Sequence, residues 1–287
     1  MLPQIQPGCA SLGPIESAAV LPLPMPESLT EKDLNDLRRA KAMLDDPGIA
    51  IQVANLLGSP IEHVLAKKLP KRATALIDKA ANAAVTAAFN AAVLSMRKDR
   101  LGIPARNWLH RGAAVGAGAV GGFFGLAGLV VELPFTTTAI LRSIADIARA
   151  EGESPHEVDT RLACIEVLAM GGRGKNDDGA ESGYFATRAV LAQQISAVSQ
   201  HVLKHGLSGG GAPVVVRLVN SIASRFSVPV TQKVMAEAVP VIGAVTGAAL
   251  NAIFITHFQK MARGHFIVRR LERTHGAELV RQAYDAA

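Results

Sequence analysis

His201 and His205 have the spacing of paired metal ligands, because residues four apart lie on the same face of an α-helix. A zinc hydrolase built on such a pair also needs a glutamate beside the first histidine and a third ligand. Here Val-Leu-Lys separates the two histidines, and the sequence offers no third ligand. We therefore expect an exposed helix end, with a metal site as the alternative.

Other catalytic patterns are incomplete. Residues 169–176, AMGGRGKN, resemble a phosphate-binding loop, but Ala169 replaces its first glycine and Asn176 replaces its Mg²⁺-binding hydroxyl. No serine lies in a nucleophile elbow, and Cys164 lies in no local catalytic motif. We expect a non-enzymatic protein that needs no cofactor.

Glu132 is the most unusual carboxylate, because it directly follows a long apolar segment, where an unpaired charge is costly. Pro134 predicts a break there, with helices over 108–131 and 135–150 forming a hairpin. Arg142 is then a plausible partner across the turn, and a structural ion pair is the favoured interpretation. The enzymatic alternative is a hydrolase or peptidase that uses Glu132, Arg188 or the histidine pair.

Two apolar segments must position these side chains. Residues 112–131, GAAVGAGAVGGFFGLAGLVV, contain no charge and seven glycines, and residues 238–258 contain one amide, Asn251, near their middle. Asn251 is suited to a hydrogen bond across a helical bundle. Glycines that share one helical face would let another backbone approach closely, and these form the predicted helix-packing groove: Gly118, Gly121, Gly122, Gly125, Gly128, Gly243 and Gly247.

Both segments have the length of a membrane span, which is about 20 residues, but their small and polar residues make insertion nearly neutral in free energy. Three interpretations remain: the buried centre of a soluble helical domain, membrane association by hairpin insertion or interfacial docking, and true spanning. Spanning is the least favoured. A lipid or apolar-ligand carrier that uses the glycine groove is a further alternative.

Composition predicts one all-α domain over residues 27–287, a multi-helix bundle with the two Gly/Ala-rich helices packed together at its centre. Residues 1–26 are rich in proline and predict a disordered leader. Two cysteines and no basic N-terminal region fit the cytoplasm. Aromatic residues make up only 4% of the chain, so its net charge of +6 does not predict nucleic-acid binding.

Positive charge gathers after the second apolar segment. It predicts a basic face for anionic headgroups, at about 1 kcal/mol per residue. Its members are Lys260, Arg263, Arg269, Arg270 and Arg273.

Three motifs occur in order: Glu132-Leu-Pro after the glycine segment, the helix start Gly183-Tyr-Phe-Ala-Thr-Arg188, and Pro240-x-x-Gly-Ala before Asn251. Together they resemble the EcsC protein family over residues 70–276, with Glu132 where that family commonly has aspartate. The resemblance implies a mostly helical, membrane-peripheral accessory protein of bacteria and transfers no catalytic residue, although the family has sometimes carried a peptidase label. We expect a cytoplasmic protein, peripheral or hairpin-inserted at the inner membrane, whose partner is lipid or a membrane protein such as a transporter.

Overall fold

The computed structural model describes residues 28–45, 49, 69–95, 125–171, 183–205, 212–237 and 243–287, and every structural statement below concerns these residues. The predicted leader lies outside them.

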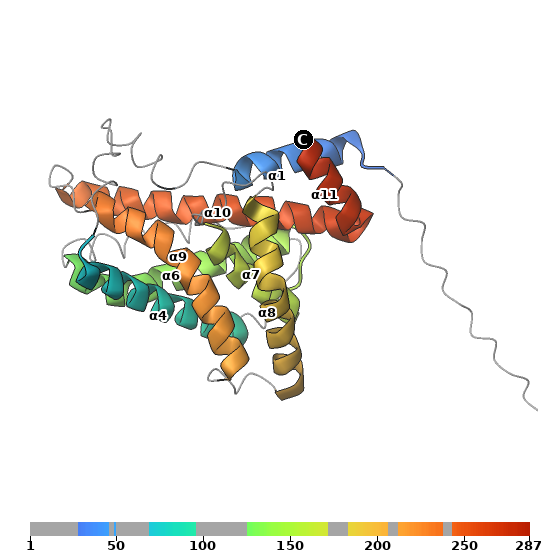
Figure 1. Cartoon of the computed structure of the whole chain (residues 1–287). Helices are drawn as coiled ribbons and strands as arrows, with labels where there is room; N and C mark the ends of the chain where they lie inside the picture. Colours follow the sequence, from blue (N-terminus) through green and yellow to red (C-terminus); the bar gives the residue numbers. More distant parts are fainter. Residues whose placement is uncertain are drawn as a thin grey trace, which may run out of the picture.

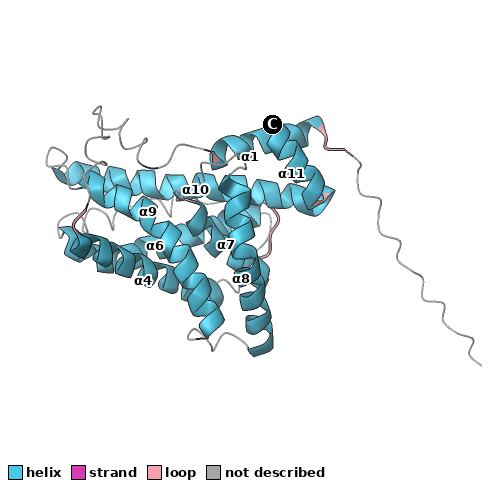
Figure 2. Cartoon of the chain, in the orientation of Figure 1, coloured by secondary structure: helices cyan, strands magenta, loops and turns pink. Residues whose placement is uncertain are grey.

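All eight elements in the described ranges are α-helices, and none of these ranges contains a strand (Figure 2). The chain therefore has the predicted all-α fold. The helices are α1 (Glu31–Leu44), α4 (Lys71–Ser95), α6 (Gly125–Ala150), α7 (Val158–Met170), α8 (Gly183–His205), α9 (Pro213–Glu237), α10 (Gly243–His275) and α11 (Ala277–Ala286).

The longest helix, α10, runs along the length of the molecule (Figure 1). Helices α6, α7 and α9 pack against it, and α4 packs against α6, α7 and α9. Near the C-terminal end of α10, α1 and α11 cover it and contact each other. Helices α6 and α10, which contain the described parts of the two apolar segments, pack against each other. The contact between the segments themselves stays a prediction.

The helix α7 lies at the centre of the bundle and contacts α4, α6, α8, α9 and α10. Residues 160–169 are all buried. A helix that is covered on every side has no polar face left for water, so α7 shares the centre with α6 and α10.

The predicted break at Pro134 is wrong, because α6 continues through it as one helix. Pro229 likewise lies inside a continuous helix, α9. An internal proline costs about 3 kcal/mol. In α6, Leu133 is buried before the proline and Ile140 and Ile144 after it. Each such side chain contributes about 1.5–3 kcal/mol by burial, so packing outweighs the lost backbone hydrogen bond.

Gly264 lies where α1 crosses α10. A Cβ atom on Gly264 would be 2.6 Å from Leu44 Cγ and 2.9 Å from the backbone oxygen of Ala40. We expect Gly264→Ala to lower the free energy of unfolding by about 1–3 kcal/mol through overpacking, although alanine normally stabilises a helix by about 1 kcal/mol. Urea unfolding measures the change.

The control is Arg263→Ala, at the exposed neighbouring position. A Gly264→Ala variant as stable as the wild type would show that α1 does not depend on this close approach.

Candidate functional site

Two apolar side chains are exposed one turn apart near the start of α6. Val131 is 79% exposed and Phe135 is 58% exposed. Residues four apart share a helical face, so together they form an apolar patch.

The patch adjoins one end of the molecule, which we call the apolar end: the starts of α6 and α10 and the end of α9. These three helix ends lie together in Figure 1. Helix α6 begins inside the glycine-rich segment and α10 begins inside the second apolar segment. Gly125 and Gly128 lie in α6, and Gly243 and Gly247 lie in α10.

The other glycines of the predicted groove, Gly118, Gly121 and Gly122, lie outside the described residues. Close packing of glycine against glycine therefore stays a prediction.

Glu132 lies next to the apolar patch but points inward. Its Oε1 atom accepts hydrogen bonds from Lys233 Nζ at 2.7 Å and from Asn251 Nδ2 at 3.1 Å. Lys233 is 1% exposed, and its ammonium group lies 5.6 Å from the centre of the Phe254 ring. Because the three polar residues come from α6, α9 and α10, this buried cluster joins the helices that form the apolar end.

The cluster contains the hydrogen bond across the bundle that the sequence predicted for Asn251. The predicted partner of Glu132 is wrong, because the carboxylate pairs with Lys233. Arg142 is exposed. Ten residues along a continuous helix span about 15 Å, so an unbroken α6 holds Glu132 and Arg142 too far apart to pair.

Three arginines of the predicted basic face are paired with carboxylates of this chain. Arg269 makes a two-hydrogen-bond contact with Glu153, at 2.7 and 3.0 Å. Arg270 bonds to both Glu151 and Asp36, at 2.9 and 2.8 Å. Arg273 also bonds to Glu153.

These ion pairs connect α10 to α1 and to the loop before α7. The paired arginines do not form an open basic face. Lys260 is partly buried and Arg263 is exposed on the same helix.

Arg188 lies far from Glu132 in the sequence and joins a different set of residues. Its two terminal nitrogens donate to the Glu272 carboxylate, at 2.7 and 3.0 Å. It also donates to the Tyr184 hydroxyl at 3.3 Å, and that hydroxyl lies 3.1 Å from Nδ1 of His265. Burial lowers the pKa of His265 well below its usual range.

The rings of His201 and His205 stack at 4.7 Å between centroids, at the end of α8. Nδ1 of His205 lies 3.3 Å from the backbone oxygen of His201. Within the described residues, no group of three or more histidine, cysteine, aspartate or glutamate side chains is arranged to hold a metal ion.

Glu166 is a residue that sequence reasoning missed. It lies on α7 and is 5% exposed. Burial raises its pKa from an ordinary value of 4.5 to about 7, although the charges of Arg188 and Arg269 act in the opposite direction. A carboxyl group that exchanges its proton near neutral pH is a common feature of functional sites. Its sequence context, Cys-Ile-Glu-Val-Leu, offers one hint, a single charge within an apolar run.

An all-helical bundle with an apolar end and a buried charged cluster beneath it thus defines the class of this protein. The chain belongs to the EcsC protein family, whose model matches residues 31–271. The match begins at α1, earlier than the resemblance over 70–276 indicated. No curated protein and no solved structure matches the chain.

Proposed function

We propose that this protein is a non-enzymatic accessory protein of the bacterial cytoplasm. It docks through its apolar end onto the inner membrane, or onto the helices of a membrane protein such as a transporter. The observation that carries the proposal is the apolar patch of Val131 and Phe135, exposed on α6 at the end of the glycine-rich segment.

Contiguous exposed apolar surface commonly marks a site of contact with protein or membrane. The described starts of α6 and α10 lie at the same end of the molecule (Figure 1), so both apolar segments join the bundle beside this patch. None of the described helices has both the length and the apolar character needed to cross a bilayer.

The geometry favours apolar contact over electrostatic attraction as the main source of affinity. Arg269, Arg270 and Arg273 are bonded to carboxylates of the same chain, so their charges are balanced within the molecule. A headgroup would have to compete with those carboxylates. Binding through the apolar patch should depend only weakly on ionic strength.

We expect the double variant Val131→Ser/Phe135→Ser to bind membranes about tenfold more weakly than the wild type, or weaker still. Complete burial of each original side chain would contribute about 1.5–3 kcal/mol, and partial insertion less. Flotation of the full-length protein with vesicles of phosphatidylethanolamine and phosphatidylglycerol measures the bound fraction.

The matched control is Leu203→Ser/Val216→Ser, which removes two other exposed apolar side chains. These lie near the end of α8 and the start of α9, away from the apolar end (Figure 1). This control should float as the wild type does. The proposed lipid docking fails if the wild type does not float, or if the Val131/Phe135 variant floats equally well. If the wild type does not float but is recovered with membranes containing native proteins, in a manner that requires the patch, the membrane-protein form is supported.

A further inference from the structure

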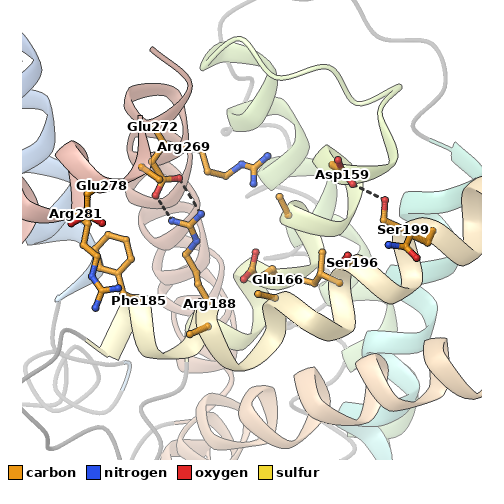
Figure 3. Close-up of a pocket in the computed structure, with 16 residues that line it drawn as sticks. Asp159, Glu166, Phe185, Arg188, Ser196, Ser199, Arg269, Glu272, Glu278 and Arg281 are labelled. Carbon is orange, nitrogen blue, oxygen red and sulfur yellow. Dashed lines mark hydrogen bonds and ion pairs between the residues drawn. The ribbon is translucent and has the colours of Figure 1, made fainter. Parts of the chain in front are cut away.

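A groove with a volume of about 650 Å³ lies at the junction of α7, α8, α10 and α11 (Figure 3). Phe185, Arg188 and Ser196 line it from α8, and Glu272 and Glu278 line it from α10 and α11. In the close-up, Glu166 of α7 lies between Arg188 and Ser196. The groove is separate from Glu132 and the apolar end.

The Glu166 side chain is buried, and none of the described residues donates a hydrogen bond to its carboxyl group. Arg188 and Arg269 lie close enough to influence its charge. The guanidinium of Arg188 instead donates to Glu272, and that of Arg269 donates to Glu153. Because Glu166 lines the groove, a bound molecule that carries a donor would be able to hydrogen-bond to its carboxylate.

The charges around the groove favour a positive ligand. The lining includes three arginines, Arg188, Arg269 and Arg281. Four carboxylates belong to the same lining: Asp159, Glu166, Glu272 and Glu278. Outside the lining, Glu153 binds both Arg269 and Arg273, so Glu153 and Arg273 together add no net charge. With all of these groups ionised, the region is net negative.

We propose that this groove binds a small organic amine in its protonated form, with the ammonium group donating hydrogen bonds to the Glu166 carboxylate. The ammonium supplies both the missing donor and the missing positive charge. Apolar lining residues, among them Phe185 and Ile195, give the carbon chain of the amine a surface to pack against. To bind Arg188 or Arg269, an anion would have to displace Glu272 or Glu153 from these arginines.

The test is isothermal titration calorimetry of the full-length protein with butylamine and with 1-butanol, its neutral analogue. Butylamine should bind and butanol should not. Glu166→Gln should weaken butylamine binding about tenfold or more, because a hydrogen bond to a charged group is lost. Asp78→Asn, a charge change at an exposed position of α4, should leave it unchanged.

Binding should also depend on pH. The charged and titratable groups facing Glu166 are Arg188 and Tyr184 of α8, and Arg269 and Glu272 of α10. The pKa values of Arg188 and Arg269 are raised above their ordinary value, and burial raises the pKa of Tyr184. None of these three groups therefore titrates between pH 6 and 8. Butylamine should thus bind about tenfold more tightly at pH 8 than at pH 6, as Glu166 loses its proton and the amine keeps its own. Glu166→Gln should remove this dependence.

Ser196→Trp provides a second variant, which fills the groove from an exposed position and leaves Glu166 in place. It should also weaken butylamine binding. Three results would overturn the proposal: no binding of butylamine to the wild type, equal binding of butanol, or equal binding of butylamine to the wild type and Glu166→Gln. Because no vesicle is present, these results are independent of membrane docking.

Discussion

Replacing Lys233 by methionine should lower the free energy of unfolding by about 3–5 kcal/mol at neutral pH. The substitution leaves the Glu132 carboxylate buried, with Asn251 as its only remaining hydrogen-bond donor in the described residues. Methionine keeps much of the volume of the lysine side chain, so the loss reports charge more than packing. Urea unfolding at pH 8 measures it.

The double variant Glu132→Gln/Lys233→Met is the control for this experiment. It removes both charges, and a buried ion pair replaced as a unit is often neutral in stability. The double variant should therefore recover most of the loss. A single variant within about 1 kcal/mol of the wild type would contradict the importance of the pair.

Replacing Glu166 by glutamine should stabilise the protein at pH 8 more than at pH 4. The difference in free energy of unfolding between the variant and the wild type should be roughly 3 kcal/mol larger at pH 8 than at pH 4. The folded protein holds the Glu166 proton more tightly than the unfolded chain does, because burial raises the pKa from 4.5 to about 7. The wild type therefore loses this contribution to stability as the pH rises between those two values. Glutamine resembles the protonated carboxyl group and does not titrate.

Urea unfolding of both proteins at several pH values between 4 and 8 gives the difference curve. This difference in free energy of unfolding should be constant below pH 4.5, rise between pH 4.5 and about 7, and level off above that pH. The exposed control Asp78→Asn should produce no such rise. A flat curve for Glu166→Gln would show that Glu166 has the same pKa in the folded protein and in the unfolded chain.

The helical class of the protein was predicted correctly from the sequence, but the end of a helix at Pro134 was not. Composition predicted the all-α fold, and the ordered motifs around Glu132, Arg188 and Asn251 were sufficient to predict the family. Pro134 led to a false predicted break, because the effect of proline on the backbone is local. The burial that keeps α6 and α9 continuous comes from helices far away in the chain.

The partners of the charged residues could not be predicted from local sequence either. The apolar run before Glu132 indicated that this carboxylate needs a partner, yet Arg142 was selected because it is near in sequence. The actual partner, Lys233, lies 101 residues away. The arginines after the second apolar segment were expected to face lipid. Three of them instead bind carboxylates from α1 and from the loop before α7.

The helical class, the family, the two apolar segments and the need of Glu132 for a partner can all be predicted from the amino-acid sequence. Which charges meet, which prolines are tolerated, and where Glu166 lies depend on how the helices pack. Helical periodicity depends on neighbours within one or two turns, whereas the state of a buried charge depends on whatever helices pack around it. Those helices come together only when the chain has folded.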